Sequence, residues 1–302
     1  MNLEPFCELC KATQQKDQRW AEAFCATLDG VFDDDRFMDM GKVCRLFYGK
    51  SRGLSKAQFY RKRKYIIDLY RWLEQEGCVS RQFREQVEEL HMDDVMSEEE
   101  LSKFYFASID SAVGYITNVG RRHSVGGDDD LLPVKATVIL TWYQVDLAEM
   151  TLIKKSDLNA EDNTVQIRGD NSRVVTLDEK SFKLLKLFAD AVNYNSFPGG
   201  TQGTYQSSIY LFRSNRSSQL NEDNIKCFIK RFNVEADAGQ LISLLSIKKC
   251  GVFYETLQQA TDADSVNSII QSLAKCNRQI AFGYAKLYSR WKQRFHNGEE
   301  MV

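Results

Sequence analysis

The chain has 302 residues, and its 40 lysines and arginines nearly balance 42 aspartates and glutamates, which leaves a net charge of -2. The length suits two domains, and a hydrophobic fraction of 43% excludes a wholly disordered chain. No apolar run reaches the ~18 residues that a membrane-spanning helix needs. No basic start followed by an apolar stretch marks a secretory signal, so we expect a cytoplasmic protein.

Residues 1–94 are predicted to form a helical N-terminal domain. Its clearest helix follows Ser55, a residue suited to cap a first turn. Apolar residues then recur at helical spacing from Phe59 to Leu73, and Gly77 ends the pattern. Further helices are predicted near residues 20–28 and 81–90.

Cys7 and Cys10 form a lone CxxC pair among eight cysteines. A zinc site needs further ligands at suitable spacing, and Cys25 and Cys44 each stand alone. We therefore expect reduced thiols that pack among apolar side chains, with no metal and no cofactor. Zinc or redox chemistry at Cys7 and Cys10 is the alternative.

Residues 95–302 are predicted to form a second, mostly helical domain. A helix is expected to begin at Ser97, with the acids of residues 98–100 near the positive end of its dipole, and to continue through Ile116. Residues 126–130 are expected to form a solvated turn, with a cation site as the alternative. The remaining predictions are a helical region at 134–155, a β-hairpin at 163–168 and 173–177, a helix at 181–192, a loop at 194–208 and helices after Asn221. The fold class is thus mainly α with a small β-hairpin or sheet.

Three C-terminal segments carry a family resemblance. Leu211-Phe212-Arg213-Ser214 is followed by Leu245-Ser246-Ile247-Lys248-Lys249 and then by Ala281-Phe282-Gly283-Tyr284. In this order, and after the predicted hairpin, they resemble the tyrosine recombinases of the phage-integrase family over residues 40–295. The resemblance implies a two-domain DNA clamp, in which a helical core-binding domain accompanies a degenerate catalytic domain.

In that family a tyrosine attacks a DNA phosphate while two arginines hold the phosphate oxygens, because a guanidinium matches phosphate geometry. The resemblance assigns the tyrosine to Tyr284 and the family's acidic residue to Glu149. The other charged positions of the family fall on residues of different type. The first arginine corresponds to Asp146, and the hairpin lysine falls at or beside Asp170. The His-x-Leu-Arg-His box corresponds to Leu245, Lys248 and Lys249, and the later histidine or tryptophan corresponds to Lys275.

These replacements predict that the chain does not cleave DNA. An aspartate about 5 Å from a phosphate, at an effective dielectric of about 20, is unfavourable by about 3 kcal/mol where an arginine would attract. A phenol with a pKa of about 10 is also a poor nucleophile at neutral pH without a base and a charge clamp. On the alternative interpretation, Tyr284 is an ordinary aromatic residue on an apolar helix face.

DNA binding is predicted from the distribution of basic residues. Ten lysines and arginines lie between Lys42 and Arg71, where Asp68 is the one acid, and aromatic residues lie among them. Such a strip suits phosphate contacts, whereas the plainer interpretation is a solvated helix face. The candidate DNA-binding residues are Lys50, Arg52, Lys56, Arg61, Lys62, Arg63 and Lys64 in the first domain and Lys226, Lys230, Lys248, Lys249, Lys275 and Arg278 in the second.

Trp291 and Phe295 lie in a basic tail after the tyrosine. The resemblance implies that such a tail docks on a neighbouring protomer, which would need both side chains exposed. Packing onto the same chain is the alternative.

The leading functional hypothesis is a non-catalytic protein that binds double-stranded DNA and acts as a transcriptional repressor. The overall pattern resembles the master repressors of SP-beta-type prophages, which look like inactive tyrosine recombinases. A divergent but active recombinase that uses Tyr284 is the enzymatic alternative. A protein-interaction partner that regulates recombination without touching DNA is the third hypothesis.

Overall fold

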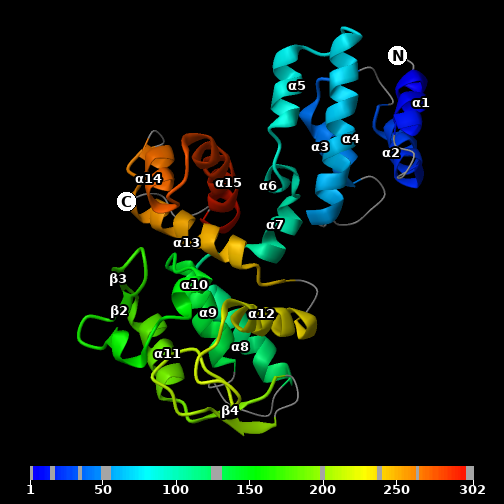
Figure 1. Ribbon diagram of the computed structural model, residues 1–302. Coiled ribbons are helices and arrows are strands. Elements are labelled where there is room, and N and C mark those ends of the chain that lie inside the picture. Colours follow the sequence, from blue (N-terminus) through cyan, green and yellow to red (C-terminus); the bar gives the residue numbers. More distant parts are fainter. Residues whose placement is uncertain are drawn as a thin grey trace. The chain divides into compact units, whose positions relative to one another are not determined.

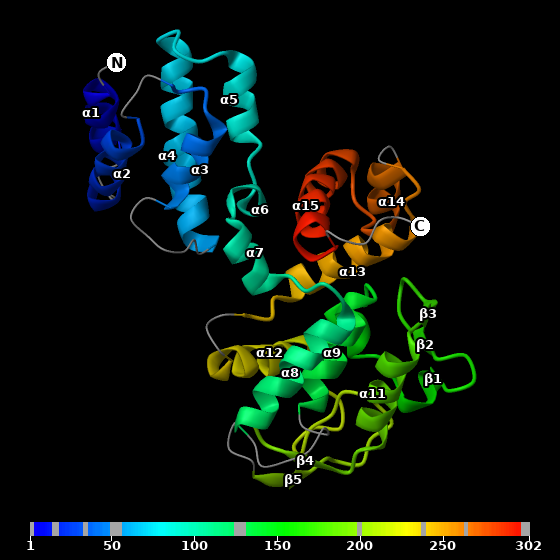
Figure 2. The same cartoon turned by 180° about the vertical axis from the view of Figure 1, so that it is seen from behind.

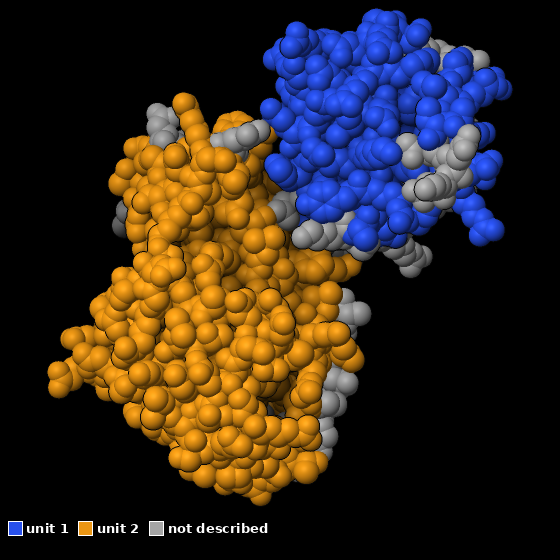
Figure 3. All heavy atoms as spheres, viewed as in Figure 1, with its two compact units in different colours: residues 1–100 blue, residues 101–302 orange. Residues whose placement is uncertain are grey.

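The computed structural model describes residues 3–13, 18–32, 36–48, 56–123, 131–197, 201–236, 240–262 and 265–296. It divides into two compact units, residues 1–100 and 101–302, which are coloured separately in Figure 3. The sequence places the division between residues 94 and 95, and the structure places it between 100 and 101.

The first unit is helical throughout its described residues, as predicted (Figure 1). Its helices are α1 (Glu4–Thr13), α2 (Gln18–Val31), α3 (Met40–Tyr48), α4 (Lys56–Gln75), α5 (Arg81–Glu88) and α6 (Met92–Val95), and α7 (Glu98–Phe104) spans the division between the units. The three helices predicted in this region correspond to α2, α4 and α5. Ser80 caps α5 by accepting a hydrogen bond from the backbone amide of Phe83 at 3.2 Å.

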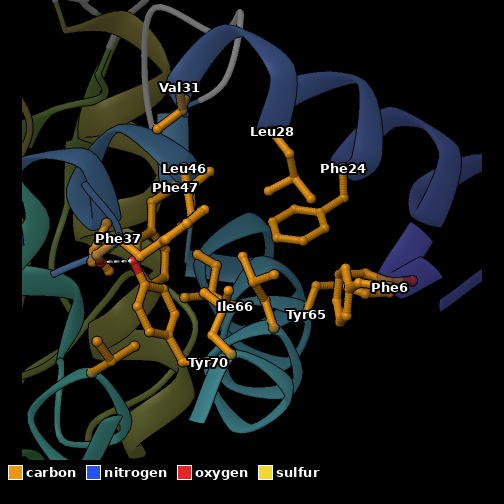
Figure 4. Close-up of a cluster of buried hydrophobic side chains, with 14 of the residues drawn as sticks. Phe6, Phe24, Leu28, Val31, Phe37, Leu46, Phe47, Tyr65, Ile66 and Tyr70 are labelled. Carbon is orange, nitrogen blue, oxygen red and sulfur yellow. Dashed lines mark hydrogen bonds between the residues drawn. The ribbon is translucent and has the colours of Figure 1, made fainter. Parts of the chain in front are cut away.

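Helix α4 holds the core of the first unit together. Its apolar face buries Tyr65, Ile66 and Tyr70 against side chains from α1, α2 and α3, and Figure 4 shows these side chains pointing toward one another. The Tyr70 hydroxyl donates to the Phe37 carbonyl oxygen at 2.9 Å, so the polar end of a fully buried ring is satisfied. Burial raises the pKa of Tyr70 well above its ordinary value.

Two basic residues of α4 cap other helices. The Lys62 ammonium donates to the carbonyl oxygens of Phe47 at 2.6 Å and Tyr48 at 3.0 Å, at the C-terminal end of α3. The Arg63 guanidinium donates to the carbonyl oxygens of Leu90, at 3.2 Å, and Glu88, where α5 ends. A cation at a helix C-terminus satisfies carbonyls that have no partner within the helix and interacts favourably with the dipole.

The second unit is mostly helical with two small antiparallel sheets, which confirms the predicted fold class. Its helices are α8 (Ile109–His123), α9 (Leu132–Trp142), α10 (Leu147–Met150), α11 (Glu179–Asp190), α12 (Glu222–Glu235), α13 (Leu244–Gln259), α14 (Ser265–Leu273) and α15 (Arg278–His296), with a 3-10 turn at Lys155–Asp157. One sheet has the order β1 (Leu158–Asn159), β2 (Thr164–Ile167), β3 (Arg173–Thr176), and the other pairs β4 (Asn193–Asn195) with β5 (Gln202–Thr204).

Helix α9 is the centre of the second unit. Every residue from Leu132 to Trp142 except Pro133 is buried, as expected for a helix that is apolar on all sides. It packs against α8, α11, α12 and α13, and Figures 1 and 2 show these helices arranged around it. The packed core therefore holds both ends of α9 in place.

Three predictions for this unit are wrong in detail. The helix expected from Ser97 to Ile116 is broken, because the backbone around Phe106 bonds elsewhere: its amide donates to the Cys250 Sγ at 3.4 Å and its carbonyl accepts from the Trp291 indole at 2.9 Å. Ser108 then caps the start of α8 by accepting from the Ser111 amide at 3.1 Å.

The helical region expected at 134–155 ends at Trp142, because Gln144 adopts a left-handed conformation with φ of +63°. Only the short α10 follows, and the chain then pairs with a distant segment, the Lys155 amide donating to the Ile209 carbonyl oxygen at 2.8 Å. The segment expected to be a loop at 194–208 contains β4 and β5, whose register pairs Tyr194 with Gly203. The hairpin of β2 and β3 and the helix α11 are confirmed.

Among the described residues, no helix combines the length and the apolar character needed to cross a bilayer.

Replacing Lys62 with methionine tests its role as a cap. The variant keeps the aliphatic stem but leaves two carbonyl oxygens at the end of α3 without their donor, so we expect the free energy of unfolding to fall by about 1–3 kcal/mol. Urea denaturation followed by circular dichroism measures this loss. The control is Lys11→Met, at an exposed position of α1, which should change stability by less than about 0.5 kcal/mol. Equal losses in the two variants would contradict the capping role.

Candidate functional site

The first part of the site is the turn between α9 and α10. Asp146 begins α10 in a capping box, in which its backbone amide donates to the Glu149 Oε2 at 2.8 Å. Because the box fixes both residues on one turn, the Asp146 carboxylate faces outward, with its side chain 62% exposed, while the Glu149 carboxylate is mostly buried.

Glu149 binds Arg173 at the start of β3. The two Arg173 NH groups reach the two Glu149 oxygens at 2.5 and 3.1 Å, a bidentate pair, and one of them also donates to the Gln144 carbonyl oxygen at 2.8 Å. Burial alone would raise the pKa of Glu149, but the Arg173 guanidinium and the Asp146 amide outweigh it and hold that pKa below its ordinary range. The pair ties the hairpin to α10.

Asp146 makes an ion pair with Lys248 on α13. The Lys248 ammonium donates to the Asp146 Oδ1 at 2.7 Å, across 102 positions of sequence. Both side chains are well exposed, at 36% and 62%, so solvent screens the pair and it contributes little to stability. The main effect of the pair is on the local electrostatic potential, because the two charges at this surface largely cancel each other.

Close packing of α13 on the end of α9 sets this geometry. A Cβ on Gly251 would lie 1.9 Å from the Trp142 carbonyl oxygen, so this position accepts only glycine without a backbone shift. The Gln144 side-chain amide bridges the two helices, donating to the carbonyl oxygens of Trp142 at 3.1 Å and Lys248 at 2.8 Å.

Tyr284 lies beside Lys249, the residue of α13 that follows Lys248. The Lys249 ammonium is 5.0 Å from the centre of the Tyr284 ring, and the Phe253 ring meets the tyrosine edge-on at 6.3 Å. Lys249 itself is only 6% exposed. Two consecutive lysines of α13 thus face two different partners, Asp146 and Tyr284.

The structure brings five of the eight positions that the resemblance singled out into two contacting groups, Asp146 with Glu149 and Lys248, and Lys249 with Tyr284. The other three lie outward. Asp170 is exposed in the turn between β2 and β3, Leu245 is 57% exposed, and Lys275 is exposed with a left-handed φ of +47°. Among the described residues, no hydrogen bond or ion pair links Asp170 or Lys275 to the other five.

Arg173 lies at the centre of this group, although it was not among the residues predicted from the sequence. Its position at the start of the second predicted strand was visible, but an arginine opening a hairpin strand is most simply a solvent-facing residue. Only the folded hairpin shows that it points at Glu149. The buried Gln144 Oε1 was also unforeseen, and it accepts no hydrogen bond from the described residues.

The candidate DNA-binding residues of the first unit divide by exposure. Lys50 and Arg52 lie outside the described residues, as does the side chain of Lys56. Lys62 and Arg63 cap helices, as described above. Arg61 and Lys64 are exposed on α4, where the Arg61 guanidinium lies 4.4 Å from the centre of the Trp20 ring.

In the second unit most of the predicted DNA-binding residues are on the surface. On α12, Lys230 is exposed, and Lys226 is exposed beside Asp223 at 3.4 Å. Arg278 is exposed at the start of α15. Lys248 is paired and Lys249 buried as described, and contact of any of these residues with DNA stays a prediction.

The expected exposure of the tail is wrong for Trp291. This side chain is 1% exposed and packs on its own chain, with its ring 5.8 Å from that of Phe253 and its indole bonded to Phe106. Phe295 is half-buried on the same helix. Leu287, Tyr288 and Trp291 of α15 therefore lie in the core of the second unit, which agrees with the alternative stated for the tail.

No group of three or more histidine, cysteine, aspartate or glutamate side chains within the described ranges is arranged to hold a metal ion.

Comparison with known proteins gives structural likenesses alone. No known protein-family model matches the chain, and no curated protein matches it in sequence. Among solved structures the chain is similar to XerA recombinase, with 14% identity, a TM-score of 0.42 and 99% of each chain covered. It is also similar to a lambda integrase dimer bound to a COC' core site, with 11% identity, a TM-score of 0.39 and 99% and 96% of the two chains covered.

An integrase from mycobacterium phage Brujita is a third likeness, with 12% identity, a TM-score of 0.36 and 99% and 94% of the two chains covered. All three are tyrosine recombinases or integrases, the family suggested by the order of motifs. At these TM-scores and identities, neither a cleavage activity nor a DNA site carries over to this chain.

Replacing Glu149 with glutamine tests the buried pair with Arg173. The variant leaves the guanidinium without its charged partner, so we expect a loss of about 2 kcal/mol at neutral pH. Because the pKa of Glu149 is lowered in the folded state, its contribution is present above the unfolded pKa of about 4.3 and disappears as the pH falls through the lower folded value. Urea denaturation at neutral and acidic pH should therefore show the wild type and the variant converging in acid. A difference that persists unchanged at low pH would contradict the assignment.

Proposed function

We propose that this chain is a DNA-binding protein built like a tyrosine recombinase but not equipped to cleave DNA, and that it acts as a transcriptional repressor. One observation carries the proposal: Asp146 and Lys248, the two positions that the resemblance assigns to the family's arginines, form an ion pair with each other. Two arginines would present a doubly positive clamp, whereas a carboxylate bonded to a lysine is close to neutral.

The electrostatics of this pair disfavour a reacting phosphate. Phosphoryl transfer relies on fixed positive charge around the non-bridging oxygens, since charge develops there in the transition state. The exposed Asp146 carboxylate repels that charge, and Lys248 already donates to Asp146 at 2.7 Å. Lys249 is buried against the Tyr284 ring, and no histidine among the described side chains belongs to this group.

Exposed cations support the DNA-binding part of the proposal. Arg61 and Lys64 face outward from α4, and the exposed Tyr60 precedes them. In the second unit Lys230 faces outward from α12. Lysine and arginine bind phosphates without any requirement for reaction geometry, so these residues suit backbone contacts even where cleavage is lost.

An active recombinase is the second candidate, and Arg173 is the observation that favours it. It brings a guanidinium next to Glu149, beside the turn that holds Asp146. Both of its terminal NH groups, however, already donate to Glu149, so binding a phosphate would require that buried pair to open.

A nicked suicide duplex, which traps a covalent protein–DNA adduct, separates the two candidates. We expect no adduct from the wild-type chain. The double variant Asp146→Arg and Lys248→Arg tests whether cleavage is lost because these positions lack the two arginines that would hold the phosphate. An adduct formed by the wild type and lost in Tyr284→Phe would overturn the proposal in favour of the recombinase. The adduct is measured by denaturing gel electrophoresis with a labelled strand, and an active recombinase serves as the positive control.

Charge reversal on α4 tests DNA binding. The double variant Arg61→Glu and Lys64→Glu should weaken binding to a labelled random-sequence duplex by at least about tenfold at low salt, and should reduce the salt slope by about 2 if both residues contact phosphates. Fluorescence anisotropy over a salt titration measures both quantities.

The matched control reverses two exposed charges elsewhere in the same unit, Lys11→Glu on α1 and Arg81→Glu on α5. Lys62 and Arg63 are left intact because they cap helices. Equal weakening in the two double variants would mean that overall charge, and not this face of α4, controls binding. Absence of binding by the wild type at low salt would leave the protein-interaction hypothesis.

A further inference from the structure

A cavity of about 660 Å³ lies in the second unit between the start of α9, the strand β4 and the two residues after it, Tyr205, the segment 213–217 and α12. Pockets that bind small organic molecules have volumes of about 300–1,000 Å³. The cavity shares no residue with the group around Asp146 and Lys248. It is therefore a second site, separate from that group.

Positive charge without a matching acid marks this cavity. Arg213, Arg216 and Arg231 line it, and no aspartate or glutamate lines it among the described residues. Arg216 and Arg231 are exposed, and neither forms an ion pair within the described part of the chain. Such a lining favours an anionic ligand, because guanidinium groups bind carboxylates and phosphates with paired hydrogen bonds.

Arg213 forms the fixed floor of the cavity. It is 1% exposed, and its NH groups donate to carbonyl oxygens at the end of α11, those of Phe188 at 3.1 Å, Ala189 at 3.0 Å and Ala191 at 2.7 Å. These neutral acceptors hold the guanidinium but do not cancel its charge. Among the described residues no carboxylate is hydrogen-bonded to this guanidinium, and Asp190 at the end of α11 acts on it only at longer range, so the buried cation adds positive potential to the cavity.

Aromatic rings form part of the wall. The Arg213 guanidinium lies 4.8 Å from the centre of the Tyr205 ring, which lies 4.8 Å from the Tyr194 ring. Phe197 also lines the cavity. Ser214, Ser217 and Asn224 add neutral polar groups. Rings and hydrogen-bonding groups beside cations suit a planar, polar body attached to an anionic group.

We propose that this cavity binds a small organic anion that carries a planar ring, of the size and chemistry of a nucleoside monophosphate. Arg216 and Arg231 hold the anionic group, and the aromatic wall holds the ring.

Isothermal titration calorimetry of the full chain with the common nucleoside monophosphates tests the proposal. We expect at least one of them to bind with a Kd below about 1 mM, and the matching nucleoside and ribose phosphate each to bind at least about tenfold more weakly. Arg216→Ala and Arg231→Ala should each weaken binding by at least about tenfold. Arg19→Ala, an exposed arginine on α2, is the control and should leave binding unchanged.

Two results would overturn the proposal. The first is that no nucleoside monophosphate binds, and the second is that ribose phosphate binds as tightly as the nucleotide. Arg213→Lys is not used as a test because it would disturb the end of α11.

Discussion

The contact of α13 with the end of α9 is the constraint on which the site depends. Gly251 allows the two backbones to approach closely, and the Gln144 amide bridges them. As a consequence Lys248 reaches Asp146, while the next residue, Lys249, faces Tyr284. If the two helices stood one side chain further apart, the contact of Lys248 with Asp146 would open.

Charge at this site is cancelled within the chain. Asp146 neutralises Lys248, and Glu149 neutralises Arg173, so these two pairs add little net charge to the site, where the Lys249 ammonium lies 5.0 Å from the centre of the Tyr284 ring. The cavity at the other end of α9 shows the opposite arrangement, with three arginines and no acid among its described lining residues. A phosphate-like group is therefore better accommodated at the start of α9 than at its end.

The basic residues of α4 show how far a charge run can be interpreted from sequence. Four consecutive cations, 61 to 64, look alike in the sequence, yet a helix turns them in different directions. Arg61 and Lys64 face solvent, whereas Lys62 and Arg63 cap α3 and α5. Tests of DNA binding that alter all four together would therefore confuse loss of binding with loss of the fold.

The sequence by itself determined the helical character of both units, the hairpin of β2 and β3, and the candidate positions Asp146, Glu149, Lys248 and Tyr284, because periodicity, turn residues and motif order are local properties. Tertiary structure decided what those positions touch. The break at Phe106, the burial of Trp291 and the pairing of Arg173 with Glu149 all depend on groups far away in the chain. Backbone and side-chain groups that could equally form a helix or face solvent take their partners from the packed core, and no local pattern encodes that choice.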